Sequence, residues 1–546
     1  MLKNNEKGST LITVLLVFMI FMTLGLAVMA ASINGAKRTE SRETNIVENL
    51  DDLKAMKEGL GIIEGYIAAK GADLVKKDIL TYKTTLASFI NDQNDKQQAV
   101  ADAGNTRFTI SDITESEFAG FINPVLDYTR VFAITAGPYK QNVYVTAMPS
   151  FLKYAVGSRA ALTLNGSASI DGNIYASESL NISNEAQYIY NENNKLVKTQ
   201  LPVAKNEVEV FVDSQTVSLC SSELACYDDS FAKKDYTWKP INSSQLNDAF
   251  SDGNPSMHVG DKPNFIDVDI LQTFLEKLNG LGLNIPYFPD GTGLGKEEYS
   301  RLKKNHLITE IQNITASNIN VAVIKNFHNI SQHDEKALLY QGDANIDTHD
   351  LELRDDQWLI VNGNARLESS GNSHMDVKGN ILITGDLTVK GDLGFSSVIY
   401  ALGDTDLNSV NITCYKRNCG DTNGTLILMT QGQLDIAIVN KFKDAKTEKT
   451  NIQGYLYTDS KAEVYAVGSL LSVNGGIFSY EDLNINSYRG NASDASTDLR
   501  FTADEHIDAS RLTVKNDNRL FLNQLQGLPK ASGLEVIPER LEINEE

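Results

Sequence analysis

Apolar positions near the amino terminus form one long, nearly uninterrupted block. From Val14 to Ala31 only Thr23 and Gly25 interrupt a run of Leu, Val, Ile, Met, Phe and Ala. About 18 such residues rise about 27 Å as a helix, close to the thickness of a bilayer core. We therefore predict a transmembrane helix over 9–36. Its lipid-facing residues are Leu11, Val14, Leu15, Leu16, Val17, Phe18, Ile20, Phe21, Leu24, Leu26 and Val28.

Beyond this block the apolar residues recur at spacings of three and four, which is typical of an amphipathic helix. The stripe comprises Ile46, Leu50, Leu53, Met56, Leu60, Ile63 and Ile67. It predicts one stalk helix from Ser9 to about Ala68. A second helix is predicted around 74–90. From Arg107 the period shortens to that of strands, with a turn at Gly137-Pro138. Residues 37–150 are thus predicted to form a helical stalk with a small α+β head.

Short apolar strands separated by Asn, Asp and Gly fill most of the remaining chain. Leu162 and Leu180 are about 18 residues apart, roughly one coil of a repeat, and Gly-Asn or Gly-Asp pairs recur at 363, 379, 385, 391 and 403. We predict a mainly-β domain, a right-handed parallel β-helix (β-solenoid), with first coils at 151–186 and further coils at 339–522. Between them an irregular insertion is predicted over 187–338, and an extended tail over 523–546. An ordinary β-sandwich remains the alternative.

Length and charge narrow the class of protein. The 546 residues carry a formal net charge of −22, with a pI near 4.8. Binding to nucleic acid or to anionic lipid requires clustered Lys and Arg that release counterions, so neither is expected as a partner. We also expect no cofactor. The chain class is α+β, with a membrane helix followed by a large acidic part on one side of the bilayer.

The junction before the apolar block resembles the class III signal of type IV prepilins. The leader 1–8 is short, ends in Lys7-Gly8, and is followed at once by the apolar run. The resemblance implies cleavage by prepilin peptidase between Gly8 and Ser9 and N-methylation of Ser9. Major pilins carry Glu at the fifth mature position, where this chain has Thr13, as minor pilins with a PilX-type segment often do. A plain, uncleaved single-pass anchor is the alternative.

The side of the membrane on which the acidic part lies is weakly encoded by charge. Lys3 and Lys7 precede the apolar run, and Lys37, Arg38 and Arg42 follow it, so the positive-inside rule is close to undecided. An extracellular carboxyl part is implied by the pilin resemblance and by the cysteines.

Four cysteines occur as two close pairs, Cys220 with Cys226 and Cys414 with Cys419. Two local disulfides in an oxidising compartment are predicted. A four-thiolate zinc site is the competing interpretation, although five and four intervening residues differ from the tight zinc knuckle. Either arrangement would hold loops rather than carry out chemistry.

Signals for catalysis are few, and we expect no catalytic residue and no metal site. The glycine-rich loop 289–296 lacks the residues of a phosphate-binding loop, and His328 and His333 are not spaced for one helical face. Asp386, Asp392 and Asp404 could serve a polysaccharide-active enzyme, or calcium at the corners. Asp after Gly more often accepts backbone hydrogen bonds of a turn.

These observations predict a minor pilin or pseudopilin of a type IV pilus-like surface fibre. It would act in assembly initiation, tip capping or adhesion through an exposed β-solenoid, without enzyme activity. The expected partners are the membrane, other pilin or pseudopilin subunits, the pilus assembly machinery, prepilin peptidase and a surface glycan or host or abiotic surface. Two alternatives remain, namely a membrane-anchored polysaccharide-active β-helix enzyme and a plain membrane-tethered surface scaffold.

Overall fold

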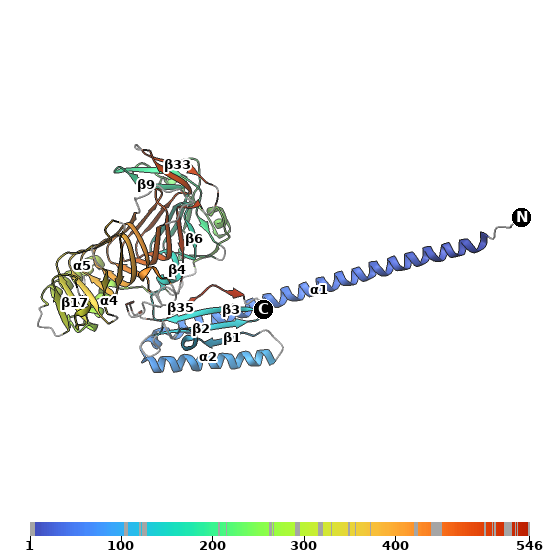
Figure 1. Cartoon of the computed structure of the whole chain (residues 1–546), viewed down its shortest axis with the longest axis horizontal. Coiled ribbons are helices and arrows are strands. Elements are labelled where there is room, and N and C mark those ends of the chain that lie inside the picture. Colours follow the sequence, from blue (N-terminus) through green and yellow to red (C-terminus); the bar gives the residue numbers. More distant parts are fainter. Residues whose placement is uncertain are drawn as a thin grey trace.

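The structure combines a long amino-terminal helix with a large mainly-β domain (Figure 1). The computed structural model describes residues 6–102, 107–118, 122, 128–205, 208–214, 216–260, 265, 267–289, 295–314, 320–328, 330–347, 350–354, 356–371, 373–419, 424–437, 450–495, 498–504, 506, 509–517, 527–529, 531 and 533–543.

Helix α1 (Glu6–Val75) contains 70 residues, which at about 1.5 Å per residue give a rod about 105 Å long. Its amino-terminal part extends away from the rest of the molecule (Figure 1), and its carboxyl-terminal part packs on the head. Of the predicted stripe, Met56, Ile63 and Ile67 are buried, whereas Ile46 and Leu50 are exposed because the helix there lies beyond the head. The helix also ends seven residues later than predicted, so 74–75 belong to α1.

The head is a small antiparallel sheet covered by α1 and α2 (Ile79–Asp102). Its strands are ordered β1 (Thr109–Asp112), β2 (Thr129–Ala136), β3 (Tyr139–Thr146) and β35 (Glu535–Pro538), and β36 (Glu542–Ile543) also pairs with β3. The short helix α3 (Thr114–Glu117) follows β1. A predicted head confined to 37–150 is therefore wrong, since the carboxyl-terminal segment supplies its last strands. The large β-domain is an insertion between two neighbouring strands of the head.

Most strands of the inserted domain pair in parallel in three columns. The first column runs through β16 (Val321–Ile324), β17 (Ala337–Gln341), β20 (Trp358–Asn362), β23 (Asn380–Ile383), β24 (Leu387–Ala401), β26 (Leu426–Thr430), β28 (Thr450–Thr458), β30 (Leu471–Ser479), β4 (Tyr154–Ser158), β7 (Asn173–Ala176), β12 (Glu209–Val212) and β15 (Ser256–Val259).

The second and third columns are built in the same way. The second contains β18 (Ala344–Ile346), β21 (Ala365–Glu368), the start of β24, β25 (Thr405–Cys414), β27 (Leu434–Ala437), β29 (Ala462–Ala466), β31 (Leu483–Ser487), β5 (Ala161–Gly166), β8 (Ser179–Ser183) and β13 (Val217–Cys220). The third contains β19 (Leu351–Glu352), β22 (His374–Lys378), the middle of β24, the later part of β25, the starts of β28 and β30, β34 (Leu512–Lys515), β6 (Ser169–Asp171) and β11 (Val203–Ala204). The last residues of β24 are the part that pairs in the first column.

Smaller elements decorate these columns. They are the antiparallel hairpins β9 (Glu185–Tyr190) with β10 (Asn193–Lys198) and β32 (Gly490–Asp494) with β33 (Leu499–Ala503), the short strand β14 (Lys239–Pro240), and helices α4 (Ile270–Gly280) and α5 (Lys296–Gln312).

The order of strands in the columns does not follow the sequence. Strand β30 pairs with β4, and β31 pairs with β5 in a register that places Ile485 opposite Leu164. Residues 321–515 and 154–259 thus form two blocks stacked end to end. Leu162 and Leu180, predicted to lie roughly one coil apart, are paired in parallel register. The bounds predicted for the irregular insertion, 187–338, are wrong at both ends. At the first end β11–β13 and β15 belong to the columns, and at the second end β16 and the start of β17 do.

The burial pattern of each column reflects what covers it. In the second column apolar and polar residues alternate, as in Ala462–Ala466, because one face lies on the core and the other faces outward. First-column strands such as Leu426–Thr430 are buried throughout. Their outward face packs on α4, α5 and the head sheet, while their inward face lines the domain core. Parallel strands covered on both faces read as continuous apolar runs.

Helix α4 places one lysine in this packed layer. The Lys277 ammonium donates to the Leu528 carbonyl at 2.8 Å and lies 5.6 Å from the centre of the Trp358 ring. Burial, partly offset by Glu276, lowers the pKa of Lys277 to about 8. The folded state therefore binds fewer protons than the unfolded state between that pH and the ordinary lysine pKa of about 10.4.

Stability contributed by Lys277 should rise with pH in this window. Lys277→Met keeps an apolar stem on Trp358 and removes the titration. We expect the free energy of unfolding of the natural chain, relative to Lys277→Met, to increase by about 2 kcal/mol from pH 7.5 to 9.5. Denaturant unfolding at the two pH values measures it. Lys96→Met, at a lysine with a 62% exposed side chain, is the control and should show no such change. Equal pH dependence of the natural chain and Lys277→Met would contradict the expectation.

Candidate functional site

The clearest candidate site is the apolar amino-terminal part of α1. Every predicted lipid-facing residue is exposed, from 44% at Val17 to 69% at Phe21. By length and composition α1 can cross a membrane. Each central Leu, Ile, Phe or Val favours insertion by about 0.3–0.6 kcal/mol, so the exposed run favours a bilayer or an apolar protein environment by several kcal/mol.

The predicted processing site lies at the start of the same helix. Gly8 and Ser9 are within α1, but the burial of both residues and the placement of residues 1–5 of the leader lie outside what the structure describes. Cleavage after Gly8 and methylation of Ser9 therefore stay predictions.

A second feature is the way the head sheet holds the inserted domain. One face of the sheet, including Phe132, Val143 and Val536, packs on α1 and α2. The opposite face, including Val131, Tyr144 and Ile537, packs in the same cluster as the first column. The sheet is therefore covered on both sides. The contact between the head sheet and the inserted domain was not predicted. Its residues form short apolar runs, and such runs occur in any buried strand.

Polar contacts reinforce the return of the chain to the head. The Glu535 carboxylate, 7% exposed, accepts hydrogen bonds from Ser150 and Lys153 at the entrance to the inserted domain. The Glu539 carboxylate accepts hydrogen bonds from the Asn142 amide at 2.9 Å and from the Tyr144 hydroxyl at 2.5 Å. Charged hydrogen bonds of this kind contribute more than neutral ones when buried.

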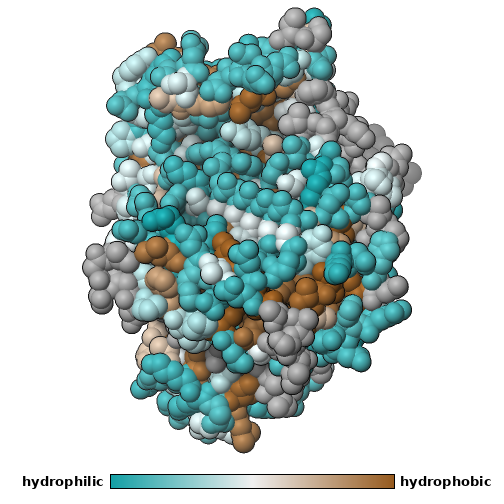
Figure 2. Space-filling model, turned by 90° about the vertical axis from the view of Figure 1, so that its left-hand side faces the viewer, coloured by the Kyte–Doolittle hydropathy of each residue, from teal (hydrophilic) through white to brown (hydrophobic). Residues whose placement is uncertain are grey.

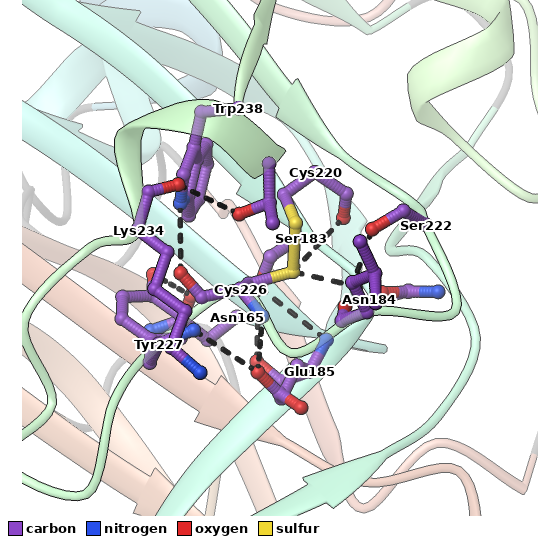
Figure 3. Close-up of a disulfide and its surroundings, with 12 residues drawn as sticks. Asn165, Ser183, Asn184, Glu185, Cys220, Ser222, Cys226, Tyr227, Lys234 and Trp238 are labelled. Atoms are coloured by element: carbon purple, nitrogen blue, oxygen red, sulfur yellow. Dashed lines mark hydrogen bonds between the residues drawn. A yellow bond between two sulfur atoms is a disulfide. The ribbon is translucent and has the colours of Figure 1, made fainter.

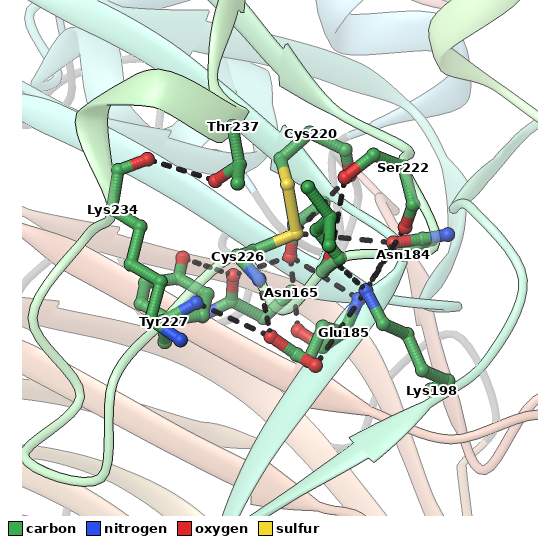
Figure 4. Close-up of polar contacts among 12 residues, drawn as sticks. Asn165, Asn184, Glu185, Lys198, Cys220, Ser222, Cys226, Tyr227, Lys234 and Thr237 are labelled. Atoms are coloured by element: carbon green, nitrogen blue, oxygen red, sulfur yellow. Dashed lines mark hydrogen bonds and ion pairs between the residues drawn. A yellow bond between two sulfur atoms is a disulfide. The ribbon is translucent and has the colours of Figure 1, made fainter.

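Both predicted disulfides are confirmed, so the zinc alternative for these four sulfurs is wrong. Figure 3 shows Cys220–Cys226 beneath Trp238, whose indole N–H donates to the Cys226 carbonyl at 3.1 Å. The Glu185 carboxylate accepts the Cys226 backbone N–H at 2.7 Å. Figure 4 shows Lys198 approaching the same carboxylate, at 3.6 Å. This buried network fixes the loop onto β8 and β9, which is a structural role.

The second disulfide, Cys414–Cys419, closes a loop beside a polar cluster on the third column. His374 lies 3.2 Å from the Asp376 carboxylate and 3.4 Å from that of Asp392. Arg417, in the disulfide loop, pairs with Asp392. Burial alone would raise the pKa of Asp392, but hydrogen bonds from Asn411 and Arg417 lower it below its ordinary value. A carboxylate held ionised by an arginine suits loop attachment better than proton transfer.

The carboxylates proposed for an enzyme are not assembled in one site. Asp386 accepts the backbone N–H of Asp404 at 2.9 Å, and Asp404 accepts that of Gln433 at 2.8 Å. Asn364 and Asp343 continue this ladder, with 2.8 Å contacts from Asp386 and Asn364. Asp392 lies in the separate cluster with His374. The corner Asp residues thus accept backbone hydrogen bonds of the next turn.

Other predicted chemistry is limited. Within the described residues, no group of three or more His, Cys, Asp and Glu side chains is placed to hold a metal ion. His328 borders a surface cavity, whereas the His333 imidazole lies 3.7 Å from the Glu335 carboxylate. The two histidines therefore have different neighbours. Most of the glycine-rich loop, 290–294, lies outside the described residues.

Comparison with known proteins gives a distant likeness among the solved structures. No protein-family model and no curated protein matches the chain. Among solved structures, the chain is similar to the competence-associated pilin ComZ from Thermus thermophilus, with 13% sequence identity and a TM-score of 0.29 over 80% of this chain and 84% of that one. A TM-score this low does not establish a shared fold.

Proposed function

We propose that this chain is a minor-pilin-like or pseudopilin-like subunit of a type IV pilus-like surface fibre. The observation that carries the proposal is the single helix α1, whose exposed apolar part continues into a part packed against a small antiparallel sheet. Such a helix can anchor the chain in the membrane before assembly and pack among other pilin helices afterwards. Gly25, Ala27, Ala30 and Ala31 would permit close helix approach there.

In this proposal the three parallel columns form a β-solenoid, a right-handed parallel β-helix, displayed outside the cell. The regular in-register parallel pairing and the ladder of corner Asp and Asn residues support that assignment. Figure 1 places β17, α4 and α5 at the end of the molecule opposite the amino terminus. A fibre built from the amino-terminal helices would therefore present this end outward, which favours initiation, tip capping or adhesion.

The proposed role is non-enzymatic, with the membrane, other pilin or pseudopilin subunits, the assembly machinery and prepilin peptidase as partners. Thr13 in place of the pilin Glu favours a subunit present in few copies at a fibre end. The hydrogen bonds that Asp386 and Asp404 accept from backbone N–H groups weigh against the polysaccharide-active enzyme. A surface glycan remains the proposed adhesive target.

Processing at the amino terminus is the decisive test. In cells with prepilin peptidase, mass spectrometry of the purified chain is expected to find Ser9 as a methylated first residue. Loss of the peptidase should leave Met1 or the intact leader. Gly8→Ala should block processing in the same way, and Gly35→Ala, which adds a methyl group to an open position on the same helix, should not. An intact leader in the presence of the peptidase would favour the plain anchored scaffold instead.

A further inference from the structure

The outward end of the inserted domain contains a cavity of about 250 Å³. It lies on the turn of chain formed by β16, β17, β18 and β19, at the end of the columns. Its lining includes Lys325, Phe327, Tyr340, Ile346, Asp347 and Asp350. Figure 2 views the molecule from this end, and the visible surface is mainly hydrophilic with apolar patches between the polar residues. The cavity is smaller than the about 300–1,000 Å³ of typical drug-sized ligand sites, so it suits a small ligand or one unit of a polymer.

The cavity has an apolar side and a polar rim. Phe327 and Tyr340 are half-buried, with ring centres 4.8 Å apart and planes inclined by 34°. Ile346 and Leu351 are buried, and the two rings pack against the cluster that contains them. The rings and these aliphatic side chains, all lining the cavity, offer an apolar surface for the C–H face of a compact ligand.

The polar rim supplies both acceptors and donors. Asp347 accepts a hydrogen bond from the Asn345 amide at 3.1 Å, and Asp350 accepts the Asp376 backbone N–H at 2.8 Å. These contacts hold the two carboxylates in place, and each oxygen has a further lone pair for a ligand. Lys325 contributes an exposed donor. The rim therefore combines anchored acceptors with donors around an apolar base.

We propose that this cavity binds one pyranose unit of a surface glycan. A sugar ring has an apolar C–H face for Phe327 and Tyr340, and hydroxyl groups that donate to carboxylates and accept from ammonium and amide groups. Phosphate and other anions are disfavoured by Asp347 and Asp350 and by the net charge of −22. A fatty acyl chain would leave the polar rim without partners. The inference rests on the proposed function only for the outward orientation of this end.

Sugar binding can be measured on the purified full-length chain in a detergent without sugar headgroups. The probes are glucose, galactose, mannose and N-acetylglucosamine, followed by saturation-transfer difference NMR. At least one should bind with a Kd on the order of 1 mM, as expected for a ligand of this size. Tyr340→Ala should raise that Kd by about tenfold or more, since it removes the ring that would stack on the sugar.

Two further variants keep the test interpretable. Asp347→Asn preserves the shape of the cavity and should weaken binding severalfold, whether or not Tyr340→Ala folds fully. Tyr236→Ala, at a tyrosine that is 74% exposed and outside the cavity, should leave binding unchanged. The proposal is overturned if no sugar binds at about tenfold above the expected Kd, or if Asp347→Asn and Tyr236→Ala behave alike. Sugar binding does not depend on Ser9 processing, so this failure is distinct from failure of the pilin proposal.

Discussion

Truncation of the chain after Gly533 is expected to unfold the head. The deletion removes β35 with its Val536 and Ile537 and the adjacent Leu534, and these three side chains are at most 5% exposed. Burying each such side chain stabilises a fold by about 1.5–3 kcal/mol, so the loss should exceed about 5 kcal/mol. That amount is comparable with the whole stability of a typical domain, about 5–15 kcal/mol. The deletion also leaves the edge of β3 unpaired and removes the carboxylate that Ser150 and Lys153 contact.

Limited proteolysis combined with thermal unfolding measures this effect. We expect rapid cleavage within the head region, 107–146, of the truncated chain. Truncation after Arg540 is the matched control, because it keeps β35. Of the described residues it removes the partly buried Leu541 and strand β36, both of whose residues are exposed. If the Gly533 and Arg540 truncations resist protease equally, the head does not depend on its carboxyl-terminal strand.

Two arginines at the centre of the apolar run are expected to abolish stable membrane association. Phe21→Arg with Leu24→Arg replaces two exposed apolar residues. Each central arginine costs about 2.5–3.5 kcal/mol on the insertion scale, and each lost apolar residue adds a few tenths more. The combined cost of about 6 kcal/mol offsets most of the driving force for insertion. Alkaline extraction of membranes should then release the variant.

The control uses the same chemistry further along the same helix. Val47→Arg with Leu50→Arg changes exposed apolar residues outside the predicted span. This double variant should remain in the membrane fraction after alkaline extraction. Release of both variants, or retention of both, would show that the run around Phe21 is not the membrane anchor.

Much of the fold follows from local patterns in the sequence. The stripe of Met56, Ile63 and Ile67 identifies the face of α1 that packs on the head, because helical spacing places these residues on one side. Leu162 and Leu180, whose spacing drew attention in the sequence, lie opposite each other on neighbouring parallel strands. The close spacing within each cysteine pair was enough to predict both disulfides.

Long-range pairing is what the local patterns could not predict. The contact of Ile485 with Leu164, and that of Glu535 with Thr146, join segments far apart in the chain. Any strand with a similar apolar pattern would satisfy either pairing, so the sequence contains no local signal for the choice. The cavity beside Phe327 and Tyr340 could not be predicted for the same reason, because its lining residues come from separate strands and loops. Segment 187–338 appeared irregular because its strands are short and widely separated.

The insertion point also determines how the molecule withstands mechanical load and peptide-bond cleavage. The chain enters the inserted domain after Thr146 and leaves it before Glu535, and these two residues are paired neighbours. Tension on the outer end would reach the head through the covalent path along β3 and through the hydrogen-bonded strand β35 beside it. Cleavage of one peptide bond in either connection would leave the inserted domain attached to the head through the other connection. The outer domain is therefore joined to the head by two chain connections that lie side by side, and cleavage of one connection would not separate the domain from the head.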